Sequence, residues 1–201
     1  LKKINDFQQL SVQQLSFRFP GSKTLLKHVS FGISKGEVVC LFGENGTGKS
    51  TILNILQKFY NPEKGDILIN SLPAEKISTG SLRSIMGIVP QQVKLFNGTV
   101  AENVCLSDSP ADFKSLIKFC HKWGFHKYIM QFPQNYSSII GEEGIQLSGG
   151  QLQLIAILRA MLRSPRLLLL DEPTSSMDRE MENFILSVLN NLKQQMGILI
   201  V

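Results

Sequence analysis

A glycine-rich loop constrains this chain more than any other feature of its sequence. It fits the pattern G-x-x-x-x-G-K-[ST] and consists of Gly43, Glu44, Asn45, Gly46, Thr47, Gly48, Lys49, Ser50 and Thr51. The apolar run Val38–Phe42 precedes the loop and is typical of a parallel-sheet strand covered on both faces. Residues 50–59 follow with the apolar spacing of a helix. The sequence therefore predicts a strand, a glycine loop and a helix in direct succession.

The residue types in this loop suit the binding of phosphate groups. Glycines let the backbone curl so that successive amide N–H groups point inward and form a nest for an anion. The helix that begins near Ser50 directs the positive end of its dipole to the same place. Lys49 supplies a mobile positive charge for β- and γ-phosphates, and the Ser50 hydroxyl is suited to binding Mg²⁺. We therefore expect a nucleotide and Mg²⁺ at this loop.

Two acids follow another apolar run near the end of the chain. Residues 166–170 predict a buried strand, and Asp171 and Glu172 come directly after it. Such a strand holds the acids at the carboxyl edge of the sheet, where ligands bind in α/β proteins. Asp171 is suited to holding Mg²⁺, directly or through water, and Glu172 to polarising an attacking water. Taken alone, the pair would be read as a solvated acidic turn.

The composition is that of a folded domain. Of 201 residues, 43% are hydrophobic and 18% charged, and 21 Lys+Arg against 16 Asp+Glu give a formal charge of +5. This balance excludes a disordered chain, and because the basic residues are dispersed we expect a mixed, solvated surface and no nucleic-acid partner. The three cysteines form no C-x-x-C pair, which predicts reduced packing residues and no metal site. No apolar run approaches the ~18–20 residues that cross a bilayer.

Strand-like and helix-like segments alternate along the chain. Strands are expected in a β meander at 11–42 and at 67–69, 84–89 and 166–170. Helical spacing occurs at 99–135, 151–163 and 179–196. This alternation predicts the fold class α/β, with an N-terminal antiparallel β meander and an inserted helical subdomain. The glycine loop resembles that of P-loop NTPases, which implies a RecA-like core.

A third motif makes the resemblance to a known family specific. The segment Leu147-Ser148-Gly149-Gly150-Gln151, taken with the glycine loop and the two acids, resembles the signature of ABC transporter nucleotide-binding domains. The resemblance runs from about residue 11 to the last residue. It implies an ATPase that binds ATP and Mg²⁺.

The resemblance also implies roles for single residues. Gln91 corresponds to the Q-loop glutamine that contacts Mg²⁺ and water, with Gln92 as a weaker candidate, and Ser175–Asp178 corresponds to the D-loop at a dimer interface. Phe19 lies where the family usually has a tyrosine that stacks on adenine, although a core position in the meander stays open for it. The catalytic set is then Glu172, Gln91 and Lys49, and the metal set is Ser50, Gln91 and Asp171.

In the family, the signature serves a neighbouring copy of the domain. Ser148 and the amides of Gly149 and Gly150, followed by Gln151, open a helix whose N-terminus faces the γ-phosphate held by the other protomer. Two ATP molecules are then sandwiched in a head-to-tail homodimer. Hydrolysis removes the γ-phosphate that both protomers hold, so the reaction drives a movement of the protomers.

Two further segments favour an exporter over an importer. Ile140–Gly144 resembles the exporter X-loop, which touches transmembrane domains, and Leu95–Val100 resembles the stretch after the exporter Q-loop. An ordinary acidic turn remains the alternative for Glu142 and Glu143. Among exporters, the sequence is most like bacterial peptide or bacteriocin exporters, and lipid and drug exporters stay open.

The expected layout follows from this resemblance. We expect a linker from a missing membrane domain at 1–10, the first part of the ATP-binding core at 11–91, the helical subdomain at 92–146 and the second part of the core at 147–201. The fragment itself is expected to be soluble, with the whole exporter at the cytoplasmic face of the cell membrane.

The sequence departs from the family in two places. The family's switch histidine lies just past a strand like Gly197–Val201, where this chain ends, so no switch residue is assigned. Leu152 and Leu154 replace the arginines that commonly follow the signature.

Two alternatives to an exporter ATPase remain, namely a soluble ABC-type ATPase acting on ribosomes or DNA and a fragment that binds ATP without hydrolysing it.

Overall fold

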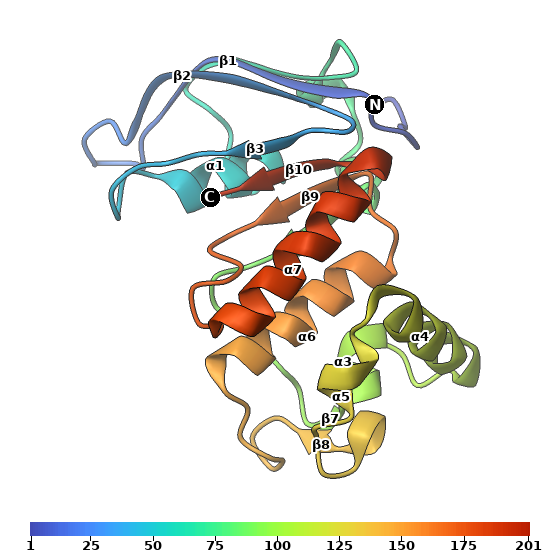
Figure 1. Cartoon of the computed structure of the whole chain (residues 1–201). Helices are drawn as coiled ribbons and strands as arrows, with labels where there is room; N and C mark the ends of the chain where they lie inside the picture. The colour runs from blue at the N-terminus through green and yellow to red at the C-terminus, as the bar shows by residue number, and fades with distance from the viewer. The chain divides into compact units, whose positions relative to one another are not determined.

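The computed structural model describes residues 1–201, and the chain divides into two compact units (Figure 1). Unit 1 consists of Leu1–Ile88, Pro165–Glu172 and Leu189–Val201. Unit 2 consists of Val89–Ser164 and Pro173–Val188. The glycine loop and the two acids after residue 170 therefore belong to unit 1, and the signature segment belongs to unit 2.

Two four-stranded sheets form the frame of unit 1, with strand orders β2-β1-β4-β5 and β3-β10-β9-β6. The strands of the first sheet pair antiparallel, whereas β10 pairs in parallel with both β3 and β9. The first sheet consists of β1 (Gln9–Phe17), β2 (Leu26–Ser34), β4 (Lys64–Ile69) and β5 (Leu72–Pro73). The second consists of β3 (Val38–Cys40), β6 (Met86–Val89), β9 (Leu167–Leu170) and β10 (Gly197–Ile200).

One hydrophobic core joins these sheets to helix α1 (Lys49–Leu56). Alternate residues of β1, the apolar face of α1 and residues of β9 and β10 belong to the same buried cluster, for example Leu15, Leu53, Leu169 and Leu199. Four of the eight residues of α1 are buried, with the spacing expected for one helix face. Burial of this face anchors α1 and hence the loop at its N-terminus.

The short helices of unit 1 are less evident in the sequence. Helix α2 (Thr79–Ser84) has the N-cap Ser78, whose side chain accepts a hydrogen bond from the Ser81 amide. Two 3₁₀ turns, η1 (Ala74–Lys76) and η3 (Lys193–Gln195), complete the unit. The helix predicted for 179–196 is α7 (Arg179–Leu192) followed by η3.

The strand before the glycine loop differs from its prediction. β3 ends at Cys40 and is an edge strand, and Val38 and Phe42 are 39% and 93% exposed. The prediction of a strand covered on both faces is therefore wrong for this segment, because Val38 and Cys40, alternate residues on the same face of the strand, are both exposed. Cys40 is exposed as well, so it is not the packing residue that the sequence predicted, whereas Cys120 is buried.

Unit 2 is mainly helical. Its helices are α3 (Val100–Cys105), α4 (Pro110–Trp123), α5 (His126–Ile129), α6 (Gly149–Leu162) and the first part of α7. A 3₁₀ turn, η2 (Asn135–Ser137), and the two-stranded sheet of β7 (Gly98–Thr99) and β8 (Ile139–Ile140) complete it. α6 lies beside α7 in Figure 1, and the sulfur of Met181 is 3.5 Å from the position of a Cβ on Gly150.

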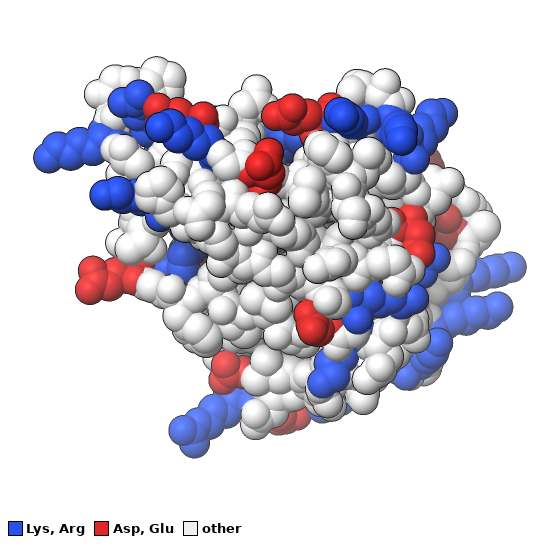
Figure 2. All heavy atoms as spheres, turned by 90° about the horizontal axis from the view of Figure 1, so that it is seen from above, with Lys and Arg blue, Asp and Glu red and all other residues white.

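The charged side chains are interspersed on the face drawn in Figure 2. Lys and Arg occur at several separate places there, with Asp and Glu among them. This agrees with the mixed surface expected from the sequence. None of the helices combines the length and the apolar character that crossing a membrane requires.

Candidate nucleotide-binding site

The carboxyl ends of parallel strands place the glycine loop and the acids at one edge of a sheet. β3 leads into the loop and β9 leads into Asp171, with β10 between the two strands. The pairing continues past the strand ends, because the Leu41 amide donates to the Ile200 carbonyl and the Glu172 amide donates to the Val201 carbonyl, each at 2.9 Å. The sheet edge therefore brings the two halves of the predicted site together.

Glycine is required at two positions of the loop. Gly46 and Gly48 have φ angles of 81° and 95°, in the left-handed region that L side chains rarely adopt. A Cβ at Gly48 would also lie 2.7 Å from Cδ2 of Leu26. The curl of the loop thus depends on both backbone freedom and close packing.

Helix α1 begins without a capping side chain. Its N-cap is Gly48, which has no side-chain hydrogen bond to the helix, and no acid occurs in the first turn. The first N–H groups of a helix have no intrahelical partners, and the dipole adds positive charge there. The N-terminus of α1 is therefore suited to an anionic ligand.

The ammonium of Lys49 lies over the loop. Its Nζ donates to the carbonyl oxygens of Gly43 at 2.9 Å and Glu44 at 3.0 Å. Two neutral acceptors hold the cation, so an anion at the loop offers it a stronger partner. Thr47 stiffens the same turn, because its hydroxyl donates to the Glu44 carbonyl at 2.9 Å.

Two of the three residues predicted for Mg²⁺, Ser50 and Asp171, meet in unit 1, whereas Gln91 belongs to unit 2. Ser50 is hydrogen-bonded to the Asp171 carboxyl, whose pKa is raised chiefly by burial and also by the charge of Glu172, while Ser50 and the charge of Lys49 oppose the rise. A hydroxyl beside a carboxylate is a hard-oxygen pair of the kind that Mg²⁺ prefers. The chain has no cluster of three or more His, Cys, Asp or Glu residues for a metal, and Mg²⁺ typically takes its other ligands from phosphate and water. The residues present therefore fit this ion.

Glu172 has an unusual backbone. Its φ angle is 47°, which is uncommon for a residue with a side chain. The hydrogen bond from the Glu172 amide to the Val201 carbonyl holds this conformation. Backbone strain of this kind concentrates at functional sites. The sequence predicted the residue and gave no sign of the strain.

Phe19 lies at the end of β1, in an aromatic cluster with Phe17 and Tyr60. Phe19 is 36% exposed, so it is not a fully packed core residue. The sequence singled out Phe19 and did not single out Tyr60, which comes from the segment between α1 and β4.

The signature residues open α6 in unit 2. Ser148 is the N-cap and forms a capping box with Gln151: the Ser148 hydroxyl accepts from the Gln151 amide at 3.2 Å, and the Gln151 side chain accepts from the Ser148 amide at 2.9 Å. Gly149 is exposed and Gly150 is buried. Gln91, which follows β6, also belongs to unit 2 and is exposed.

The predicted D-loop packs on the start of α6. Gln153 is buried and donates to the Ser175 hydroxyl at 3.2 Å while accepting from the Ser176 amide at 3.3 Å. A Cβ on Gly149 would lie 2.7 Å from Cβ of Ser176, so a glycine is needed for this approach. These contacts were not predicted, because no local sequence pattern pairs residues more than twenty positions apart.

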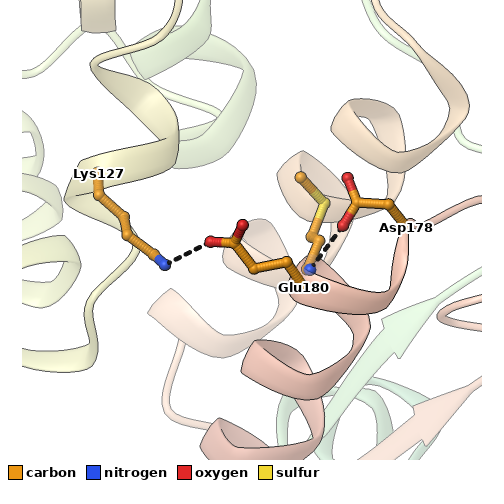
Figure 3. Close-up of polar contacts among 4 residues, drawn as sticks. Lys127, Asp178 and Glu180 are labelled. Atoms are coloured by element: carbon orange, nitrogen blue, oxygen red, sulfur yellow. Dashed lines mark hydrogen bonds and ion pairs between the residues drawn. The ribbon is translucent and has the colours of Figure 1, made fainter.

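The last residue of the D-loop caps the next helix. The Asp178 carboxylate accepts a hydrogen bond from the Met181 amide at 2.8 Å (Figure 3). Two residues on, Glu180 forms an ion pair of 3.2 Å with Lys127 of α5. Both partners of that pair are largely exposed, so we assign it a minor role in stability.

The predicted X-loop leaves β8 through a tight turn. Gly141 has a φ angle of 110°, and a Cβ there would lie 2.8 Å from the Phe96 carbonyl oxygen. The Asn97 side chain accepts from the Glu143 amide at 3.2 Å, which ties the turn to the segment after the Q-loop. Glu142 and Glu143 are exposed.

Comparison with known proteins decides the family. Residues 26–175 match the protein family described as "ABC transporter". The chain belongs to the ABC transporter family. The α/β fold class and the resemblance to ABC transporter nucleotide-binding domains, both stated from the sequence, are thereby confirmed.

Similar proteins include exporters of several kinds. The chain is 38% identical to an ATP-dependent lipid A-core flippase of Aromatoleum aromaticum, over 96% of this chain and 32% of the flippase. It is 36% identical to the leukotoxin export ATP-binding protein LtxB of Aggregatibacter actinomycetemcomitans, over 96% of this chain and 27% of LtxB. The solved structure of a bacterial Atm1-family ABC exporter with ATP bound matches with a TM-score of 0.88 and 31% identity, over 98% of this chain and 35% of that chain. The chain therefore spans about a third of the length of these relatives.

Proposed function

We propose that this ABC transporter domain binds Mg-ATP at the glycine loop and hydrolyses it to drive export across a membrane. The observation that carries the proposal is the meeting of Lys49, Ser50 and Asp171 at one sheet edge, beside a helix N-terminus that has no side-chain cap. This set supplies the amides, the cation and the hard-oxygen ligands that a nucleoside triphosphate requires. The match to an exporter with ATP bound supports the same ligand.

Binding would replace weak contacts of the loop with strong ones. Lys49 leaves the carbonyls of Gly43 and Glu44 and pairs with the β- and γ-phosphates, while amides within residues 43–51 line the triphosphate. Ser50 and Asp171 are positioned to hold Mg²⁺, with Gln91 as a further ligand. Once bound, Mg²⁺ neutralises charge that develops on the phosphate oxygens.

Glu172 is the proposed residue for activating water. It follows Asp171 directly, and its strained backbone fixes the direction in which its side chain leaves the strand. A carboxylate there polarises the attacking water and accepts a proton from it. Lys49 stabilises the charge on the transferred phosphate, and Gln91 is proposed to orient the water.

The signature segment is proposed to act on the nucleotide of a second copy. In α6, the Ser148 hydroxyl accepts one hydrogen bond within the capping box and keeps its own proton to donate. The amides of Gly149 and Gly150 add further donors at the same helix end. Two copies would thus enclose two ATP molecules, and hydrolysis would release the dimer.

The whole-protein role is proposed from the relatives. We infer the ATP-binding core at 11–91 and 147–201 and the helical subdomain at 92–146. The linker proposed at 1–10 would pack on the core, because Phe7 and Leu10 are fully buried there. Transmembrane domains are the proposed partners, contacted through the X-loop Ile140–Gly144, with the domain at the cytoplasmic face of the membrane. The relatives' names include a lipid flippase and a toxin exporter, so the cargo is not assigned.

A Glu172→Gln variant tests the proposed reaction. In the full-length protein, we expect phosphate release to fall by about 10²- to 10⁴-fold, because the variant loses the group that accepts the proton of water. The affinity for Mg-ATP should be unchanged. Glu180→Gln, on the exposed start of α7, serves as a control for the loss of a carboxylate and should hydrolyse ATP normally.

Three outcomes would count against this assignment. Near-normal turnover in Glu172→Gln would remove Glu172 from the role of base. ATP binding without phosphate release in the unaltered protein would show a binding module in place of an enzyme. Activation of hydrolysis by ribosomes or DNA would favour a soluble ABC-type ATPase.

A further inference from the structure

Three aromatic rings from two segments meet beside the end of β1. The rings of Phe19 and Tyr60 have centroids 5.4 Å apart and planes at 88° to each other. Phe17 lies 4.9 Å from Phe19 at 84° and 5.6 Å from Tyr60 at 36°. Edge-to-face contacts of this kind have a preferred geometry, so they fix the orientation of a ring as well as its position.

The end of α1 carries Tyr60 to this place. The Lys58 amide donates to Ile55 and the Phe59 amide to Asn54, each at 2.9 Å, and Lys58 has a φ angle of 60°. This is a Schellman motif, which ends the helix and turns the chain in a defined direction. The helix that begins at the glycine loop therefore delivers Tyr60 at its other end.

Two further contacts join the same segments. The Glu63 amide donates to the Ser16 carbonyl at 2.9 Å, next to the antiparallel pair of Ser16 and Lys64. The Arg18 guanidinium forms an ion pair with the Glu63 carboxylate at 2.7 Å. These bonds keep the segment around Phe19 at a fixed distance from Tyr60. A pocket lies here, lined by Phe17, Phe19, Asn61 and Glu63 among others.

The perpendicular packing leaves Phe19 suited to stacking. Neither Phe17 nor Tyr60 lies parallel to its ring, and Phe19 is 36% exposed. A partly exposed phenyl ring with no parallel aromatic neighbour is a platform on which a purine can stack. Without its neighbours, the Phe19 side chain would move among rotamers and would lose entropy on binding a base.

We propose that Tyr60 is a positioning residue that holds the Phe19 ring as the stacking platform for the nucleobase. This proposal rests on the proposed binding of ATP and extends it to a residue outside the three sequence motifs. Tyr60 is a better test than Phe17, because Phe17 is only 5% exposed and belongs to the core of unit 1, whereas Tyr60 is 41% exposed.

The test compares ligands with and without a base. In the full chain, Tyr60→Ala should weaken binding of Mg-ATP by about two- to tenfold, because one edge-to-face contact is lost. Binding of magnesium tripolyphosphate, which has no base, should be unchanged. Tyr60→Phe keeps the ring and should bind both ligands as the unaltered protein does.

A double-mutant cycle separates positioning from general damage. In a Phe19→Ala background, Tyr60→Ala should cause no further loss of ATP affinity, because the ring that it positions is already absent. The proposal would be overturned if Tyr60→Ala weakened the binding of ATP and of tripolyphosphate equally. It would also be overturned if Tyr60→Ala lowered the ATP affinity as much in the Phe19→Ala background as in the unaltered protein. If the unaltered chain bound neither ligand, the proposed function itself would fail, and the two failures are thus distinct.

Discussion

Helices α1 and α6 both begin at glycines that the sequence singled out, yet their N-termini differ. α1 has a glycine N-cap and no capping side chain, and its first residue is Lys49. α6 has a complete capping box of Ser148 and Gln151, and no Lys or Arg occurs from Ser148 to Leu158. One terminus offers unoccupied amides and a cation, whereas the other occupies part of its own hydrogen-bonding capacity.

We infer different tasks for the two termini from this difference. The α1 terminus combines N–H groups and a cation that suit a triphosphate. The α6 terminus is already capped, and its proposed role is to add a few donors to a phosphate that another site holds. The absence of arginine at Leu152 and Leu154 strengthens the contrast, and Leu154 is fully buried.

Loss of the Lys49 cation should produce the largest effect. We expect Lys49→Ala to weaken Mg-ATP binding by roughly 100-fold, because hydrogen bonds between charged groups are the strongest in such a site. Titration of ATP by calorimetry measures this directly. Lys27→Ala removes an exposed lysine from β2 and should bind ATP normally. An unchanged affinity of Lys49→Ala for Mg-ATP would contradict the difference proposed between the N-termini of α1 and α6.

Two glycines of the loop form a matched pair for stability. Gly46→Ala places a side chain in a left-handed conformation with nothing within 4 Å, so we expect a loss of about 1 kcal/mol in the free energy of unfolding. Gly48→Ala has a similar φ angle and in addition meets the side chains of Leu25 and Leu26, so the loss should be larger. Denaturant unfolding of both variants provides the measurement. Equal losses would show that the packing against Leu26 is not needed.

The smallest effect on ATP affinity is expected at the N-terminus of α6. Ser148→Ala removes the cap of α6 and should lower the free energy of unfolding by about 1 kcal/mol, with no change in ATP affinity at protein concentrations too low for a dimer. Ser148→Asp keeps a capping oxygen and adds a negative charge, so it should restore stability and prevent an ATP-dependent dimer. Light scattering with ATP present reports the dimer. A dimer formed by Ser148→Asp would contradict the role proposed for this terminus.

Much of the site could be predicted because its motifs are local. The pattern of residues 43–51 specifies the curl of a loop, and an apolar strand before Asp171 specifies the sheet edge to which the acid belongs. The positions of β4, β6, β9 and α6 also agree with the sequence to within a few residues.

The remainder depends on contacts between distant segments. The exposure of Val38 and Phe42 depends on which distant segments cover the chain there, and an apolar run does not reveal this. Tyr60 meets Phe19 because β1 and β4 pair antiparallel, and Gln153 meets the D-loop across the start of α6. α2 is six residues long and contains Gly80, so its helical pattern is too short to recognise.

Backbone amide shifts of the labelled chain give the most direct test of the contrast between the termini. Magnesium tripolyphosphate would be added at a protein concentration where the chain is monomeric, and the amide signals of both helix starts would be followed by NMR. The account predicts saturable shifts at Gly46, Gly48, Lys49 and Ser50, with the signals of Gly149 and Gly150 unmoved. Shifts confined to Gly149 and Gly150, or none at the four loop amides, would contradict it.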